Sequence, residues 1–98
     1  MKNIFIVNTA SRTGKAADLW QEIEKHLNDN NISYKVYFTK GPNDATDFAK
    51  EATSTGEDVA LFVMGGDGTL NEALNGITDF EHTYYTPVPS GSANDFVN

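Results

Sequence analysis

The chain has 98 residues, a formal net charge of −7 and no cysteine. This length suits one small domain, the charge argues against a nucleic-acid or anionic-membrane surface spread over it, and the missing cysteines exclude disulfides and thiolate metal sites. No apolar run approaches the ~20 residues of a membrane span, and no signal-peptide pattern opens the chain.

The first part of the chain predicts a strand, a helix and a second strand. Residues 4–7 are a short apolar run, followed by the polar loop 8–15. A helix ending at 28–31 then carries its apolar residues on one face, namely Ala16, Leu19, Trp20, Ile23 and Leu27. Residues 32–38 alternate between apolar and polar side chains, which is typical of a strand.

The second part repeats this alternation. A helix opens at 41–43 and presents Ala45, Phe48, Ala49 and Ala52 on one face. A buried strand over 59–64 follows, then a helix with Leu70, Ala73, Leu74 and Ile77 aligned, and an extended segment over 84–88. The order βαβαβαβ with short connections predicts an α/β fold: a three-layer sandwich with a parallel sheet and helices on both faces.

Four loops follow the predicted strands, at 8–15, 39–43, 65–69 and 89–95. Because the carboxyl ends of parallel strands meet at one edge of the sheet, and ligands of open α/β sheets bind there, we expect these loops to form the functional site.

The segment 65–69, Gly-Gly-Asp-Gly-Thr, predicts a phosphate site between the strand at 59–64 and the following helix. Glycines allow a sharp turn and close approach of a ligand, and a helix N-terminus attracts anions. The carboxylate of Asp67 would repel a bare phosphate, so we expect a bridging cation such as Mg²⁺ between them. A plain turn is the alternative: Thr69 and Glu72 match a capping box, although this leaves the glycines and Asp67 unexplained.

The common nucleotide motifs do not fit. A dinucleotide fingerprint would need glycine where Asn71 stands, and a Walker A motif would need glycine at Thr9 and a hydroxyl residue at Ala16. The first loop has donors that could wrap a phosphate, or it is a polar loop in which Ser11 or Thr13 caps the helix.

The two histidines, His26 and His82, have no partner at metal-ligand spacing, and we expect both to be solvated.

Together these motifs resemble the diacylglycerol kinase catalytic domain, in the lipid kinase family with sphingosine and ceramide kinases. Residues 65–76 look like the family signature GGDGT-x-NE-xx-NG, and residues 89–96 are similar to its P-x-GT-x-NDF element, with Ser92 in place of threonine. The loop 8–15 is similar to the N-P-x-S-G opening, with Thr9 in place of proline, and Thr39 begins a segment similar to its T-x₅-A stretch.

The resemblance implies that residues 1–98 are the N-terminal nucleotide-binding domain, Rossmann-like as in the NAD kinase/diacylglycerol kinase-like fold. It implies a truncated chain whose second, β-sandwich domain, with the general base, is absent. Such a kinase would bind ATP and Mg²⁺ and phosphorylate the hydroxyl of diacylglycerol or a related lipid. The fragment alone should fold but not phosphorylate lipid.

The expected nucleotide contacts follow the matched motifs, with Asp67 also expected to bind the metal. They are Asn8, Thr9, Ala10, Ser11, Arg12, Thr39, Gly65, Gly66, Asp67, Gly68, Thr69, Leu70, Asn71, Glu72 and Ser92.

Two other functions stay open: an NAD kinase-like kinase of a small molecule, and a non-catalytic nucleotide-binding regulator. We expect a cytoplasmic location that includes peripheral association with the inner face of the membrane, where the lipid substrate would lie. We expect no nucleic-acid partner. Exposed apolar surface, including Tyr84, Tyr85 and Phe96, predicts self-association.

Overall fold

The computed structural model describes residues 1–10 and 14–89. The elements are β1 (Lys2–Val7), α1 (Lys15–Asp29), β2 (Lys35–Phe38), α2 (Asp44–Thr53), β3 (Val59–Gly65), α3 (Asp67–Gly76) and β4 (Thr83–Pro89). Their order confirms the predicted alternation of strands and helices. Within these residues, no helix has the length and apolar character needed to cross a membrane.

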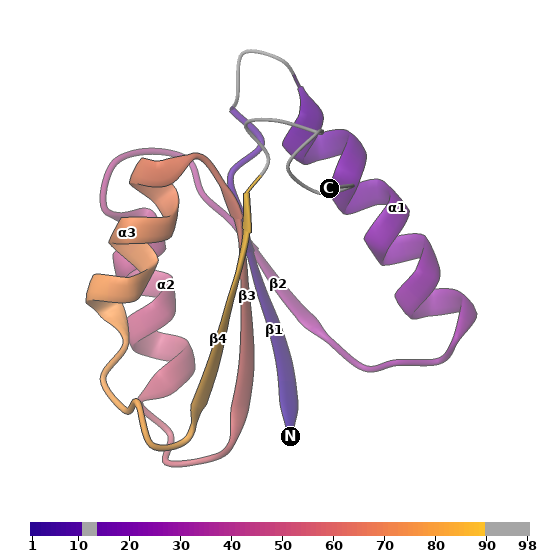
Figure 1. Ribbon diagram of the computed structural model, residues 1–98. Coiled ribbons are helices and arrows are strands. Elements are labelled where there is room, and N and C mark those ends of the chain that lie inside the picture. The colour runs from indigo at the N-terminus through magenta and orange to yellow at the C-terminus, as the bar shows by residue number, and fades with distance from the viewer. Residues whose placement is uncertain (11–13, 90–98) are drawn as a thin grey trace.

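The strands form one sheet in the order β2-β1-β3-β4, and every neighbouring pair is parallel. Figure 1 shows α1 on one face of the sheet and α2 with α3 on the other, so the molecule has three layers. All strands run in one direction, and their carboxyl ends lie at the edge where α3 begins. The predicted α/β fold with helices on both faces is confirmed.

Alternation along the strands divides the core into two layers. On the side of α2 and α3, apolar residues of β1 and β3 pack against the alanine face of α2; the buried members are Ile4, Ile6, Ala45, Ala49, Ala52, Val59, Leu61, Val63, Ala73 and Ile77. Alanines bring a helix axis close to the sheet, because their short side chains leave little space between the backbones.

The second layer, between the sheet and α1, is aromatic. Phe5 is its centre: its ring lies 4.7 Å from that of Phe62 and 5.1 Å from that of Trp20. Trp20 in turn meets the ring of Tyr34 edge-on at 5.7 Å. These rings fill the space between the sheet and α1.

Three predicted details are wrong. The second strand begins at Lys35 instead of residue 32, because β1 pairs with it only from Ile4 onward and the carbonyl of Ser33 accepts a hydrogen bond from the Asn3 side chain instead. Leu74, predicted to face inward on α3, is 40% exposed. Tyr85, predicted to be exposed, is half-buried, and its hydroxyl donates to the Leu70 carbonyl.

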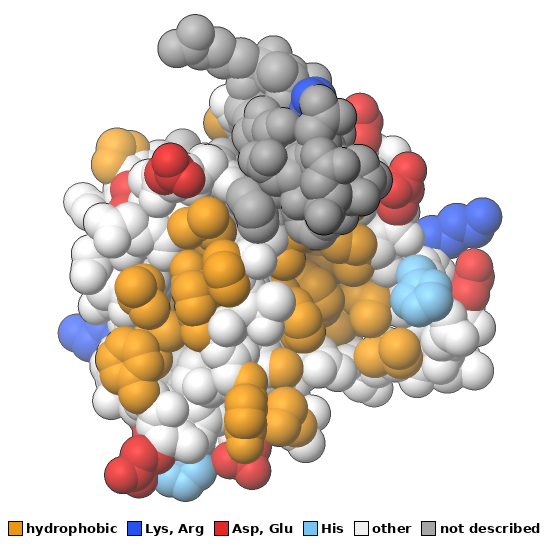
Figure 2. Space-filling view, viewed as in Figure 1, with side chains coloured by type: hydrophobic (Ala, Val, Ile, Leu, Met, Phe, Trp, Pro, Cys, Tyr) orange, Lys and Arg blue, Asp and Glu red, His pale blue; other side chains and the backbone are white. Residues whose placement is uncertain are grey.

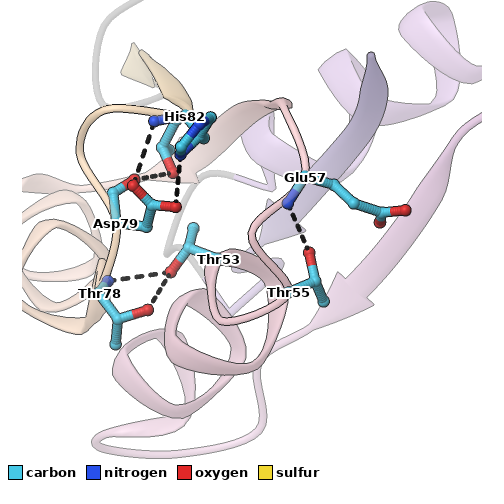
Figure 3. Close-up of polar contacts among 7 residues, drawn as sticks. Thr53, Thr55, Glu57, Thr78, Asp79 and His82 are labelled. Atoms are coloured by element: carbon cyan, nitrogen blue, oxygen red, sulfur yellow. Dashed lines mark hydrogen bonds and ion pairs between the residues drawn. The ribbon is translucent and has the colours of Figure 1, made fainter.

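At the amino edge of the sheet, the end of α2 is joined to the turn after α3 (Figure 3). The buried Thr53 hydroxyl donates to the Ala49 carbonyl at 2.7 Å and accepts the Thr78 N–H at 3.0 Å. Asp79 then bonds the Nδ1 of His82 at 2.8 Å. His82 is thus partly solvated as expected, with a side chain that is 45% exposed, and in addition it has Asp79 as a hydrogen-bond partner. His26 is exposed as expected.

Candidate functional site

The turn after β3 exposes backbone at the carboxyl edge of the sheet. Gly66 is extended, with φ −79° and ψ −178°, and α3 begins at the next residue. Gly66, Asp67 and Gly68 are exposed, whereas Thr69 is buried. A Cβ on Gly65 would lie 2.8 Å from the Cβ of Thr69, so this glycine makes room for the threonine side chain, while Gly66 and Gly68 have open space around them.

Among the described residues, no side chain caps the N-terminus of α3. Its first intrahelical bond is the one that the Leu70 N–H donates to the Gly66 carbonyl at 3.1 Å, which leaves the preceding N–H groups of the helix without intrahelical acceptors. Together with the positive end of the helix dipole, these groups form a site for an anion.

The predicted capping box of Thr69 and Glu72 is wrong. The helix begins two residues before Thr69, after an extended Gly66, and the Thr69 hydroxyl accepts a hydrogen bond from the Asn8 side chain at 2.8 Å. The Oε1 of Glu72 accepts the Asn43 N–H at 3.0 Å, so this carboxylate caps the start of the neighbouring helix α2. Packing between two helices, rather than local sequence, decides the partners of both side chains.

The loop after β1 is tied to α3 by Asn8. Its backbone N–H donates to the Met64 carbonyl at 2.9 Å, and its side-chain oxygen accepts the Ala10 N–H at 3.0 Å. Thr9 and Ala10 are exposed beside it. The predicted contacts Ser11 and Arg12, and also Ser92, lie outside the described residues.

Helix α1 has Gly14 as its N-cap, in the left-handed conformation with φ +68°. Ser11 and Thr13, the alternative caps of this helix, lie outside the described residues. A glycine suits this position because a Cβ is strained at positive φ.

The loop after β2 is held from two sides. The Thr39 N–H donates to the Val7 carbonyl at 3.0 Å, so the loop continues the contact between β1 and β2. The Oδ2 of Asp44 accepts the N–H groups of Lys40 at 2.7 Å and Gly41 at 3.1 Å. Glu72 pins the loop through Asn43, whose φ of +71° is unusual for a non-glycine residue.

The described site residues therefore meet in three loops on one sheet edge. Thr39 is half-buried and Asn71 is exposed there, whereas Leu70 packs against the core below. The supporting contacts of Asn43, Asp44 and Thr46 were not predicted from the sequence, although the Asn43-Asp44 pair at a helix start is a recognisable turn signal.

The side chains at this edge suit a cation that binds together with a phosphate ligand. Asp67 is exposed at the first position of α3, and among the described residues no three histidine or acidic side chains gather into a metal-binding group. Mg²⁺ commonly takes one or two protein carboxylates and completes its six positions with phosphate oxygens and water.

Two surface cavities lie at the opposite, amino edge of the sheet. One, of about 440 Å³, is lined by Lys35, Tyr37 and Glu51 among others; the second, of about 500 Å³, is lined by Glu57, Asp58 and other residues. The first borders the C-terminal half of α2, whose dipole disfavours a phosphate. The exposed N-terminus of α3 is the better anion site.

Residues 2–98 match the family model described as "Diacylglycerol kinase catalytic domain". The chain belongs to this family. The match covers every described element and includes the loops at the carboxyl edge.

Similar proteins of this kind occur in distant organisms. "Putative lipid kinase YtlR" of Bacillus subtilis (strain 168) is 31% identical over 94% of this chain and 30% of its own length, and sphingosine kinase 1 of Caenorhabditis elegans is 31% identical over 93% and 21%. A diacylglycerol kinase structure from Bacillus anthracis str. Sterne has a TM-score of 0.74, 30% identity, and coverage of 97% of this chain and 35% of that one. The chain spans about a third or less of each relative.

Proposed function

We propose that this chain binds Mg·ATP at the carboxyl edge of its sheet and is the nucleotide-binding part of a lipid kinase. The kinase would transfer the γ-phosphoryl group to the hydroxyl of diacylglycerol or a related lipid. The observation that carries the proposal is the N-terminus of α3, which no described side chain caps and which has exposed glycines and Asp67 beside it. Membership of the diacylglycerol kinase catalytic domain family supports the same function.

Each loop has a role in this proposal. The N–H groups at the start of α3 hold phosphate oxygens, and the loop at 8–10 covers the nucleotide with the proposed contacts Ser11 and Arg12. Thr39 and Ser92 contact phosphate or ribose, and Glu72 holds the loop that carries Thr39, through Asn43. When bound, Mg²⁺ would neutralise phosphate charge, and Asp67 would hold it directly or through water.

Phosphoryl transfer needs in-line positioning of the acceptor and a group that takes its proton. Among the described acidic residues near the α3 N-terminus, Asp44 and Glu72 accept backbone N–H groups, and Asp67 is assigned to the metal. We therefore propose that the 98-residue chain alone binds nucleotide without phosphorylating lipid, and that the general base lies in a further domain of the whole kinase.

A titration of Mg·ATP into the 98-residue chain, followed by amide NMR, tests the site. We expect shifts in residues 8–10, 39–43 and 65–72, because these loops share one edge. Shifts confined to the exposed face of α1 around 18–26 would contradict it. A radiolabelled ATP assay with diacylglycerol in mixed micelles tests the second part: metal-dependent lipid phosphorylation by the pure chain would show that it contains its own base.

A further inference from the structure

Asn8 uses both ends of its side-chain amide inside the protein. Its oxygen accepts the Ala10 N–H at 3.0 Å, and its nitrogen donates to the Oγ1 of Thr69 at 2.8 Å. Because a backbone N–H can only donate, the amide oxygen must face Ala10 and the NH₂ group must face Thr69. The direction of the second hydrogen bond is therefore set by the first.

This direction leaves the hydroxyl proton of Thr69 available. The residue is only 8% exposed, and within the described part of the chain its hydroxyl makes no hydrogen bond other than the one it accepts from Asn8. A buried donor without an acceptor is unfavourable. A hydrogen bond from this hydroxyl to an acceptor that reaches the α3 N-terminus would therefore be favourable.

We propose that Asn8 is a positioning residue: by donating to Oγ1 of Thr69, it turns the hydroxyl proton of Thr69 toward a phosphate oxygen of the bound nucleotide. The proposal rests on the proposed function, because it needs a phosphate at the α3 N-terminus. It assigns Asn8 a role through Thr69, 61 residues away in sequence, in place of a direct side-chain contact with the ligand.

A simpler role for the same contact is a mechanical link between the β1 loop and α3. Asn8→Asp separates the two roles. The introduced carboxylate keeps the bond to the Ala10 N–H and the link to Thr69, but it reverses the second bond, so that the Thr69 hydroxyl must donate to a carboxylate oxygen. A mechanical link survives this reversal, whereas the proposed orientation of the hydroxyl proton does not.

The experiment measures dissociation constants of ATP and of inorganic tripolyphosphate by calorimetry on the 98-residue chain. Four proteins form a cycle: the unsubstituted chain, Asn8→Asp, Thr69→Val and the double variant. Asn3→Asp is the charge-matched control, since Asn3 lies at the other end of β1 and donates to the Ser33 carbonyl. Thr69→Ser tests rescue, because serine retains the hydroxyl.

We expect Thr69→Val to weaken both ligands about tenfold, and Thr69→Ser and Asn3→Asp to stay within about threefold of the unsubstituted chain. Asn8→Asp also adds a negative charge near phosphate. The loss of ligand affinity caused by Asn8→Asp should therefore be about tenfold larger when Thr69 is present than in the Thr69→Val background, where only the charge effect remains.

Equal losses from Asn8→Asp in the two backgrounds would overturn the positioning role while leaving nucleotide binding intact. Full affinity in Thr69→Val would overturn it as well. Failure of the unsubstituted chain to bind either ligand would overturn the proposed function itself, and the positioning role with it. Urea unfolding of each variant identifies any loss of affinity that comes from loss of the fold.

Discussion

At the scale of single residues, acidic side chains at the carboxyl edge of the sheet hold its loops by accepting hydrogen bonds from backbone N–H groups. Glu72 binds the N–H of Asn43, and Asp44 binds two N–H groups of the loop before its own helix. Asp67 differs from both, because it is exposed at the first position of α3. It is therefore the described carboxylate at this edge that is open to a metal-bound nucleotide.

Asp67→Ala should remove the gain in ATP affinity that Mg²⁺ provides. Loss of a charge contact bridged by the metal corresponds to about 2–4 kcal/mol, or roughly 30- to 1000-fold. Affinity for metal-free ATP should stay the same or rise, since a repulsive charge is gone. Calorimetry with and without Mg²⁺ measures both values, and Asp18→Ala, at an exposed acid of α1, is the control. A retained Mg²⁺ effect in Asp67→Ala would remove the metal role of Asp67.

At the scale of elements, α2 and α3 are in close backbone contact. Gly76, at the end of α3, lies against the backbone of Thr46, where the carbonyl group occupies the place of a Cβ. The Thr46 hydroxyl donates to the Glu72 carbonyl at 2.8 Å on the same side. This packing places Glu72 beside the N-terminus of α2, so it also determines the shape of the loop that carries Thr39.

Gly76→Ala should therefore destabilise the fold by about 1–3 kcal/mol or more, because the helices must move apart to admit a methyl group. Urea unfolding gives the free energy directly. Gly41→Ala is the matched control: a Cβ there meets no atom within 4 Å and the φ of Gly41 is not positive, so its stability should be nearly unchanged. Equal stability of the two variants would mean that α2 and α3 can move apart without a decrease in the free energy of unfolding.

At the scale of the whole molecule, stability should depend on pH through the turn that joins α3 to β4. The hydrogen bond from His82 holds the pKa of Asp79 below its ordinary 3.8, and the same bond raises the pKa of His82 above its ordinary 6.5. Asp58 and Glu81 add to the rise at His82. Both side chains remain partly exposed, at 26% for Asp79 and 45% for His82.

The sign follows from the two directions. The contribution of His82 is complete below pH 6.5 and is lost as the pH rises through its raised pKa, whereas that of Asp79 is present above pH 3.8 and is lost as the pH falls through its lowered pKa. The loss of stability in His82→Gln should therefore be largest near pH 5 and smaller by about pH 9. Urea unfolding at three pH values checks this, with His26→Gln as control, since His26 contacts Asn30 instead of a carboxylate. A loss that grows toward pH 9 would contradict the assignment.

Self-association also belongs to the whole molecule and stays a prediction. Figure 2 shows apolar side chains open on the face that carries β4, between α3 and α1. Tyr84 is 57% exposed and Phe80 is 63% exposed. Because the net charge of −7 opposes contact between copies, added salt should increase association by screening it. Sedimentation at several salt concentrations measures this, and Tyr84→Lys should weaken it; the same mass at every concentration and salt level would exclude it.

The sequence by itself determined the elements and the edge where they converge. The apolar run 59–64, the helical spacing around Trp20 and the glycine turn after Met64 are local patterns, and they indicate a buried strand, the buried face of a helix and a turn. Right-handed parallel connections then bring the loops together. Only the tertiary structure decided the partners of Thr69 and Glu72. Local spacing favoured a bond between these two residues, but Thr69 pairs with Asn8 and Glu72 with Asn43. Such partners come from elements far apart in sequence. The distance between the partners depends on how closely helices and strands pack, and a local sequence pattern does not determine this packing.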